Sequence, residues 1–364
     1  MDARYSRQMV LPGFGAAAQE RLAASRVLVI GAGGLGSHVL PALAAAGVGT
    51  IGIIDNDTVE LSNLPRQLIH GTVDVGAPKV DSARASIAAL NSTVVLTYPE
   101  RLTAESALAL VADYDVIVDG SDNFPTRYLA ADAATICAKP LVWGAVSQYG
   151  GQASVALPGG PGYRDLFPTP PPPGSVDSCE VGGVLPTTVG VIGAIMASEV
   201  IKVITGVGRV LSGRVTVFDG LSGGFRELEF EKSTEPVTEL IDYEEFCAGE
   251  ISTGSIRTST GSIRTDSVTA HELSQLNSVT LIDVRETWEA EIAALPDALV
   301  IPLGSLEEVA GELDLTEEYV VYCHHGIRSQ TGLAILQAAG LRARHLEGGI
   351  DAWAREVDPT MARY

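Results

Sequence analysis

Basic residues are scarce in this sequence of 364 residues: 24 lysines and arginines stand against 45 acidic residues, a formal net charge of −21. A surface of that charge repels nucleic acids and anionic membranes, so neither is expected as a partner. Charged residues of both signs reach only 19% and hydrophobic residues reach 46%. This balance excludes wholesale disorder and favours a globular α/β protein.

Cysteines and long apolar runs are also few. The four cysteines lie far apart and form no CxxC pair, so neither a disulfide framework nor a structural zinc site is expected; they are Cys137, Cys179, Cys247 and Cys323. Residues 1–8 are polar, and charged residues interrupt the apolar stretch at 187–207. These absences predict a cytoplasmic protein without a membrane anchor.

The chain is longer than one hydrophobic core organises, which predicts two domains. In its first part, β-branched runs at 26–30, 50–54 and 115–118 lead into glycine or aspartate, and a helical pattern follows at 37–46. Strands that alternate with helices predict an α/β fold with a Rossmann-like parallel or mixed sheet. Further strands are expected at 141–143, 152–156 and 214–218, and a long helix at 188–204.

A polar segment separates this part from the C-terminal one. It carries the unit STGSIRT twice, at 252–258 and 259–265, and such small polar residues bury too little apolar area to order themselves. Strand and helix patterns then resume over about a hundred residues, enough for a second, small α/β domain. The predicted organisation is a first domain at 1–233, a flexible linker at 234–266 and a second domain at 267–364.

The first predicted strand ends in a glycine-rich turn. Gly31, Gly33 and Gly36 form GxGxxG, which lets the backbone turn sharply and approach phosphate at a helix N-terminus. Asp55 ends the next strand, where a carboxylate can bind ribose hydroxyls. These two features fit an NAD-dependent oxidoreductase as well as an ATP-dependent enzyme.

Cationic, carboxylate and amide side chains follow the predicted strands in polar loops. They are Asp57, Asn63, Arg66, Gln67, Lys79, Asp122 and Asn123. A dinucleotide fold needs no such set. A triphosphate reaction does, because charge on phosphate oxygens must be met by arginine, lysine and a carboxylate-held Mg²⁺. The set therefore favours ATP and magnesium over NAD.

With these residues the sequence resembles the MoeB/ThiF family of ubiquitin-activating-enzyme-like adenylyltransferases, from residue 4 to about residue 231. The resemblance rests on RYSRQ at 4–8, GAGGLG at 31–36, DNDTVELSNLPRQ at 55–67, GAPK at 76–79 and SDN at 121–123. It implies ATP-dependent adenylation of the C-terminal glycine of a ubiquitin-fold sulfur-carrier protein of the MoaD/ThiS type. It departs at Pro65, where the family usually has glutamine.

The resemblance also implies roles for single residues. Gly34 and Asp55 correspond to the family's adenosine and ribose contacts, and Asp122 would hold Mg²⁺. Arg7 corresponds to an arginine that reaches across a homodimer into the partner's site. The implied phosphate-handling residues are Asn63, Arg66, Gln67 and Lys79, and the implied nucleotide site also includes Gly31, Gly33, Gly36, Asp57 and Asn123.

Many members of this family hold zinc through two CxxC pairs, and this sequence departs from that pattern. Gly162 and Asp165 stand where the first pair is expected, and no cysteine lies near Glu235. We expect no zinc, so the first domain would be held by its core alone. This narrows the resemblance to the members of the family that lack zinc.

The second domain carries its own candidate nucleophile, Cys323. Backbone N–H groups of the following residues, HHGIRS, are expected to curl around its sulfur and stabilise a thiolate or persulfide. Together with LIDVR at 281–285 and EGGIDAW at 347–353, this loop resembles that of a rhodanese domain. Four residues separate Cys323 from Arg328, one fewer than in related phosphatase loops, which favours sulfur over phosphate.

The two histidines after Cys323 have an expected role of their own. His324 and His325 have no third metal ligand near them in the sequence, so a metal site is not expected. They are expected to add positive charge around the thiolate instead.

Cys179 is the other candidate thiol. It lies in the loop SCEVGGV before the long apolar helix, whose N-terminus would lower its pKa. The resemblance makes Cys179 a conjugating or resolving cysteine, and a buried structural cysteine is the alternative.

The combined features predict an adenylyltransferase and sulfurtransferase. Cys323, charged with sulfur by a cysteine desulfurase or thiosulfate, would convert the adenylated carrier to a thiocarboxylate. The alternatives are an NAD-dependent, sulfur-metabolising oxidoreductase and a non-catalytic scaffold that presents carrier proteins. The sequence leaves the carrier and its pathway, molybdopterin, thiamin or cysteine synthesis, undecided.

Overall fold

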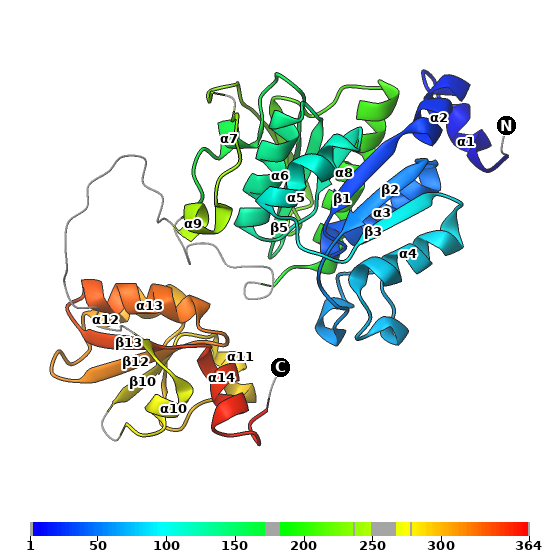
Figure 1. Ribbon diagram of the computed structural model, residues 1–364. Coiled ribbons are helices and arrows are strands. Elements are labelled where there is room, and N and C mark those ends of the chain that lie inside the picture. The colour runs from blue at the N-terminus through cyan, green and yellow to red at the C-terminus, as the bar shows by residue number, and fades with distance from the viewer. Residues whose placement is uncertain (1–2, 172–182, 236, 249–266, 277–278, 363–364) are drawn as a thin grey trace. The chain divides into compact units, whose positions relative to one another are not determined.

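The computed structural model describes residues 3–171, 183–235, 237–248, 267–276 and 279–362 (Figure 1). These residues form two compact units, one of the described residues up to 248 and the other of those from 267 onward. Each unit has its own sheet and its own hydrophobic cores.

The first unit is built on an eight-stranded sheet in the order β3-β2-β1-β4-β5-β6-β7-β8. Strands β3 to β5 in this order are mutually parallel, whereas β6, β7 and β8 each pair antiparallel with the strand before them. The strands are β1 Arg26–Ile30, β2 Thr50–Ile54, β3 Val94–Tyr98, β4 Val116–Asp119, β5 Leu141–Ser147, β6 Gly150–Ala156, β7 Arg214–Asp219 and β8 Gly224–Glu229.

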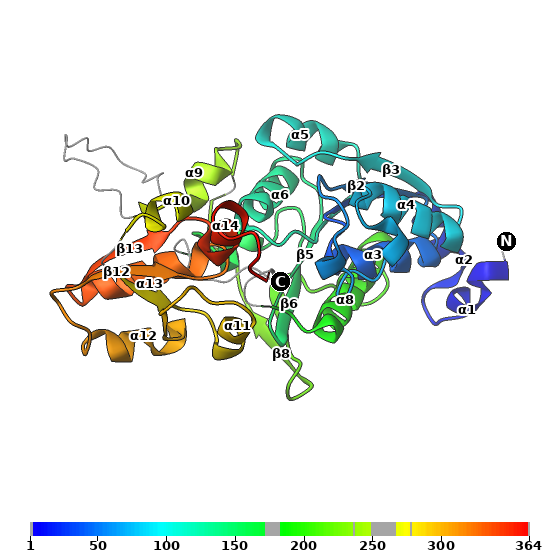
Figure 2. The ribbon, with the colours of Figure 1, turned by 90° about the horizontal axis from the view of Figure 1, so that it is seen from below.

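Helices cover both faces of this sheet (Figure 2). Because side chains alternate along a strand, Val27 and Val29 face one core while Leu28 and Ile30 face the other. The first core packs against α2 Gly15–Ala24, α3 Gly34–Ala46, α4 Lys79–Leu90 and α8 Pro186–Thr205. The second packs against α5 Ala104–Ala112, α6 Phe124–Ile136, α7 Tyr163–Leu166 and α9 Tyr243–Ala248.

Helix α8 is, among the described residues, the one helix long and apolar enough to cross a membrane. Its residues Val189, Ile192 and Met196 are fully buried in the first core. Its apolar character is therefore explained by packing against α3 and the sheet within the unit.

The carboxyl ends of three strands meet at one edge of this sheet. Ile30, the last residue of β1, pairs with Ile54 on one side and with Asp119 on the other. The chain continues from β1 to β2 and β3 on one side, and then crosses to β4 on the opposite side. Such a reversal of strand order opens a crevice in which α/β proteins bind ligands, so the nucleotide site is expected at this edge.

The second unit has a five-stranded sheet in the order β11-β10-β12-β13-β9, in which all pairs are parallel. The strands are β9 Ser267–Val268, β10 Thr280–Asp283, β11 Leu299–Val300, β12 Glu318–Tyr322 and β13 Arg342–Leu346. One face packs against α12 Leu303–Ala310 and α13 Ile327–Ala338. The other packs against α10 Ala270–Leu273 and α14 Gly349–Glu356, and α11 is Thr287–Ile292.

The predicted fold class, a Rossmann-like mixed sheet followed by a small α/β domain, is confirmed. Residues 237–248 of the predicted linker belong by their contacts to the first unit, where Tyr243 is buried in the core. The tandem repeat at 252–265 lies outside the described residues. The exact domain boundaries stay a prediction.

Candidate functional site

The glycine turn between β1 and α3 depends on glycine at two positions. Gly31 has φ of +93°, a conformation that other residues rarely adopt. A Cβ added at Gly36 would lie 2.1 Å from the carbonyl oxygen of Gly31. The turn therefore closes tightly, and α3 begins at Gly34, earlier than the predicted start at Ser37, with its first N–H groups at the sheet edge.

Asp55 lies beside this turn. Its carboxylate accepts one hydrogen bond from the N–H of Ala32 and one from the N–H of Asp57, each at 2.8 Å. Burial raises the pKa of Asp55, while these hydrogen bonds and the charge of Lys79 oppose the rise. The carboxylate is thus held rigidly where the sequence predicted a ribose contact.

Lys79 is the first residue of α4, and its ammonium group lies 2.7 Å from the carboxylate of Asp57. The lysine side chain is only 7% exposed and that of Asp57 is 57% exposed. This ion pair joins a nearly buried cation to a carboxylate at the surface.

The loop that contains Asn63, Arg66 and Gln67 closes over the glycine turn. Asn63 and Gln67 are buried, and the Arg66 guanidinium donates to the carbonyl of Ser62 at 3.0 Å. The Gln67 amide nitrogen lies 3.7 Å from where a Cβ on Gly33 would stand. Its oxygen Oε1 is buried without a hydrogen-bond partner among the described residues.

His70 connects this loop to the glycine turn by hydrogen bonds, and this residue was not predicted. Its ring nitrogens lie 2.9 Å from the carbonyl of Ala32 and 2.8 Å from the hydroxyl of Ser82. Because a carbonyl only accepts, Nε2 donates to Ala32 and Nδ1 accepts from Ser82. Burial lowers the pKa of His70, which favours this neutral form. A lone histidine in an apolar stretch gives no sequence signal for such a bridge.

The loop after β4 carries Asp122 and Asn123, both exposed. Asn123 caps α6, since its side-chain oxygen accepts the N–H of Thr126 at 2.9 Å. Asp122 makes no hydrogen bond or ion pair with a residue that the structure describes. Its carboxylate is therefore open to a cation.

Two other predicted residues are not joined to this cluster. Arg7 is an exposed residue of α1, Ser6–Met9, and only a second copy of the chain could test its expected reach across a dimer. Cys179 lies outside the described residues.

Asp165 corrects the expectation that the first domain is held by its core alone. One of its carboxylate oxygens accepts the N–H groups of Ser233 and Thr234, each at 2.7 Å, and the hydroxyl of Thr234 at 2.8 Å. The other accepts the N–H of Gly162 at 2.8 Å. These hydrogen bonds of Asp165, called the polar clamp below, thus join two segments about seventy residues apart. Gly162 and Asp165 are the two positions at which the sequence lacks the first cysteine pair of a zinc site.

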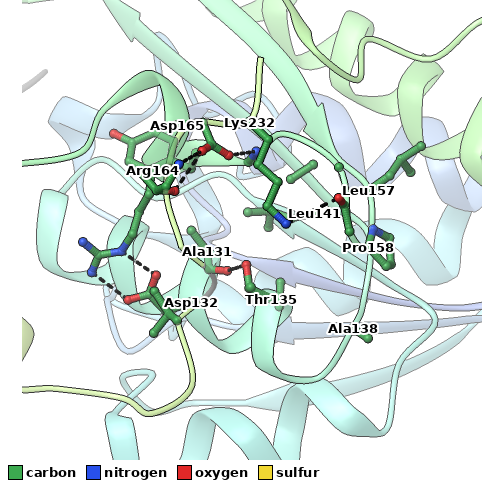
Figure 3. Close-up of a pocket in the computed structure, with 18 of the residues that line it drawn as sticks. Ala131, Asp132, Thr135, Ala138, Leu141, Leu157, Pro158, Arg164, Asp165 and Lys232 are labelled. Carbon is green, nitrogen blue, oxygen red and sulfur yellow. Dashed lines mark hydrogen bonds and ion pairs between the residues drawn. The ribbon is translucent and has the colours of Figure 1, made fainter. Parts of the chain in front are cut away.

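A cavity of about 160 Å³ lies next to this clamp, lined by α6 and by residues near 156–165 and 232–237. Figure 3 shows Asp132, Arg164 and Asp165 among its lining residues, with Arg164 paired to Asp132 by two contacts of 2.7 Å. The cavity contains none of the residues predicted for nucleotide binding.

In the second unit Cys323 follows β12 and is 1% exposed. Its sulfur accepts the N–H of Gly326 at 3.2 Å and lies 3.8 Å from the hydroxyl of Ser329. Helix α14 closes on the loop from the other side, where a Cβ on Gly349 would lie 2.3 Å from the carbonyl of Cys323. The loop therefore gives the sulfur one backbone donor, as an anion requires, while the Ser329 hydroxyl donates to the carbonyl of Gly326 at 2.9 Å.

Arg328 of the same loop is paired with a buried carboxylate. Its guanidinium forms two contacts of 2.7 Å with the carboxylate of Glu289, and both side chains are buried. Burial alone would raise the pKa of Glu289. The hydrogen bond from Arg328 outweighs burial and holds this pKa below its ordinary value. Glu289 was not predicted, because it lies on α11, far away in sequence.

The expected positive charge is wrong for His324, and a third potential metal ligand lies beside the two histidines. Burial and the neighbouring His325 lower the pKa of His324 to about 4, so His324 is neutral at pH 7 and adds no positive charge. A third potential metal ligand is also present, because the ligand atoms of His324, His325 and Asp351 lie within 4.8 Å of one another. Arg355 already pairs with Asp351 at 2.8 Å, so a metal would have to displace it.

The other two described cysteines are unreactive by their surroundings. Cys137 and Cys247 are both half-buried. Burial raises the pKa of Cys137, and burial together with Glu244 raises that of Cys247 to about 11. Both remain protonated thiols at neutral pH.

Comparison with known proteins decides the family. The model of the ThiF family matches residues 5–238, and the model of the rhodanese-like domain matches residues 268–356. The chain belongs to the ThiF family. Within this family it carries a C-terminal rhodanese-like domain, so the predicted resemblance is confirmed in both halves.

Full-length relatives share this arrangement. The chain is 46% identical to the adenylyltransferase/sulfurtransferase MoeZ of Mycobacterium tuberculosis (strain CDC 1551 / Oshkosh) over 373 residues, which cover 100% of this chain and 95% of that protein. It is 41% identical to the adenylyltransferase and sulfurtransferase MOCS3 of Bos taurus over 397 residues, 99% of this chain and 87% of that protein. This ThiF-family chain is thus an adenylyltransferase and sulfurtransferase, and its adenylation domain uses ATP.

A solved structure supports the fold of the ThiF-family part. Escherichia coli MccB with ATP aligns with a TM-score of 0.57 at 23% sequence identity, over 64% of this chain and 73% of that one. At this identity the likeness concerns the fold alone.

Proposed function

We propose that this enzyme adenylates the C-terminal glycine of a ubiquitin-fold sulfur carrier of the MoaD/ThiS type and converts it to a thiocarboxylate with sulfur from Cys323. The observation that carries the first step is the convergence of Asp55, Gln67, Lys79 and the N-terminus of α3 at one sheet edge. The carrier, the donor and a homodimeric assembly belong to this proposal.

The residues at this edge fit ATP. The buried oxygen Oε1 of Gln67 lacks a partner among the described residues and needs a donor, which the hydroxyl or amino groups of a nucleoside supply. The tight glycine turn leaves the N–H groups of α3 free for phosphate. Lys79 would exchange its contact with Asp57 for a phosphate oxygen, and Arg66 lies on the same loop as Gln67.

Mg²⁺, held by Asp122, would offset negative charge on the phosphates. The carrier carboxylate attacks the α-phosphorus of ATP, the bond to pyrophosphate breaks, and an acyl-adenylate forms. Lys79 and Arg66, with Arg7 of a second copy, would stabilise the charge that develops on the leaving oxygens.

Sulfur transfer then takes place at Cys323. A cysteine desulfurase or thiosulfate leaves a sulfane sulfur on the thiolate, and the N–H of Gly326 supports an anionic persulfide there. The terminal sulfur attacks the acyl carbon and AMP leaves, which gives an acyl disulfide. A second thiolate, from Cys179 or a small thiol, then attacks the Cys323 sulfur, and the carrier leaves as a thiocarboxylate.

Pyrophosphate exchange tests the adenylation step. We expect exchange of labelled pyrophosphate into ATP only when a carrier with a Gly-Gly terminus is present, and unchanged exchange in Cys323→Ala. Exchange without any carrier would contradict the proposed acceptor. A titration with NAD, for which no binding is expected, separates this function from the oxidoreductase alternative.

A further inference from the structure

The loop that carries Asp122 rests on a buried arginine. Arg127, on α6, is 8% exposed and donates a hydrogen bond of 2.7 Å from Nη2 to the carbonyl of Ser121, the residue before Asp122. From these contacts we infer that Arg127 is a positioning residue that fixes the Asp122 loop for magnesium. The inference rests on the proposed adenylation and assigns a role to a residue that the proposed mechanism does not use.

Arg127 also contacts Asp119, the residue at which the loop begins. Its Nε lies 3.6 Å from Oδ2 of Asp119, which is fully buried at the end of β4. The other oxygen of Asp119 accepts the N–H of Ser121 at 3.0 Å and its hydroxyl at 2.5 Å. Both Ser121 and Asp119 are therefore tied to one guanidinium.

The loop also contacts the end of β1 and the glycine turn that follows it. The N–H of Gly120 donates to the carbonyl of Ile30 at 2.9 Å, and a Cβ on Gly31 would lie 3.0 Å from the carbonyl of Gly120. With Arg127 on the other side, residues 119–121 have little freedom to move. Asp122, the next residue, then projects from a rigid base.

Tyr163, which is 3% exposed, lies near enough to Arg127 for the two side chains to interact electrostatically. Tyr163 belongs to α7, the same short helix as Asp165 of the polar clamp. Groups that orient a metal ligand in this way typically contribute 10–100-fold to metal affinity, and we apply the lower end, about tenfold, to Arg127.

Charge alone predicts the opposite effect. Arg127 is a cation close enough to Asp122 for their charges to interact. Removing that cation without moving the loop would tighten Mg²⁺ binding, because a repulsion would be lost. Positioning predicts weaker binding, so the direction of the change distinguishes the two roles.

The test measures carrier-dependent pyrophosphate exchange against Mg²⁺ concentration in the full chain. Arg127→Met is expected to raise the half-maximal Mg²⁺ concentration by about tenfold, and Arg127→Lys by less, since lysine keeps the charge but not the fork of donors. Arg164→Met is the matched control, because Arg164 is a largely buried arginine paired with Asp132 that does not touch the loop. This control is expected to keep the wild-type Mg²⁺ dependence.

Two further measurements distinguish a loss of stability in the Arg127 variants from a loss of Mg²⁺ affinity. In Asp119→Asn/Arg127→Met no buried charge is left unpaired, so this variant should melt close to the wild type and still need more Mg²⁺. Mn²⁺ binding with ATP, followed by electron paramagnetic resonance, gives the same comparison without turnover. Unchanged or tighter metal binding in both Arg127 variants, with exchange intact in the wild type, overturns the inference. Absence of exchange in the wild type with every carrier would instead remove the proposed function.

Discussion

Asp165 binds Thr234 through a single carboxylate oxygen, which accepts the backbone N–H at 2.7 Å and the hydroxyl at 2.8 Å. The same carboxylate also binds Ser233 and Gly162. It thus joins residues 233–234 to the start of α7 through hydrogen bonds. Its contribution to stability can be measured directly.

We expect Asp165→Asn to lower the free energy of unfolding of the first unit by about 2 kcal/mol, because the neutral amide weakens the acceptors and turns an NH₂ group toward N–H donors. Denaturant unfolding measures this. Asp219→Asn is a matched control in the same unit, since the Asp219 carboxylate accepts hydrogen bonds from the nearby Leu221 and Ser222, and its effect should be smaller. A chelator should leave the melting temperature of the wild type unchanged; a fall would indicate a structural metal.

The pair of Arg328 and Glu289 predicts a defect in sulfur transfer. Glu289→Gln leaves a buried guanidinium without its counter-charge, so we expect a loss of about 3 kcal/mol in stability of the second unit and a lower rate of sulfur transfer from thiosulfate. Glu291→Gln changes an exposed residue of the same helix and should have no effect. Equal rates in the two variants would show that the pair does not support the Cys323 loop.

Stability of the second unit should depend on pH through His324. The pKa of His324 is lowered to about 4, so between pH 6.5 and about 4 the unfolded chain takes up a proton that the folded unit does not. Stability therefore falls as pH falls through this window. In His324→Asn the fall should be smaller, as measured by denaturant unfolding at both pH values. An identical fall would mean that His324 does not contribute.

Reactivity should separate the described cysteines. At neutral pH an alkylating reagent should label neither Cys137 nor Cys247 rapidly, because burial raises the pKa of both thiols. Alanine at either position should leave sulfur transfer unchanged, whereas Cys323→Ala should abolish it. Loss of transfer in Cys247→Ala with normal folding would contradict the assignment of Cys247 as a residue outside the reaction.

Much of the fold follows from local patterns in the sequence. The strands at 26–30 and 50–54 occur at the predicted positions. Short runs of β-branched residues between turns strongly favour a β-strand over a helix. Strand β8 was not predicted, since all its residues are exposed and its pattern is that of a surface segment. Strand β3 was missed for a similar reason, because its residues are only partly buried.

The candidate site was predictable where residues lie in one motif and not where distant segments meet. The glycine turn, Asp55 and the Cys323 loop are each local. His70, Arg127 and Glu289 act through partners brought close by the fold, and no spacing in the sequence reports such contacts. The clamp of Asp165 is of the same kind, which is why the sequence suggested a domain held by its core alone.

The central claim is that one polypeptide adenylates a carrier and then supplies its sulfur from Cys323. Intact-mass spectrometry of a Gly-Gly carrier, incubated with the enzyme, ATP, magnesium, thiosulfate and a thiol, tests it most directly. We predict a thiocarboxylate with the wild type and, with Cys323→Ala, an adenylated carrier or unmodified carrier without sulfur. Thiocarboxylate formed at the wild-type rate by Cys323→Ala would contradict the account.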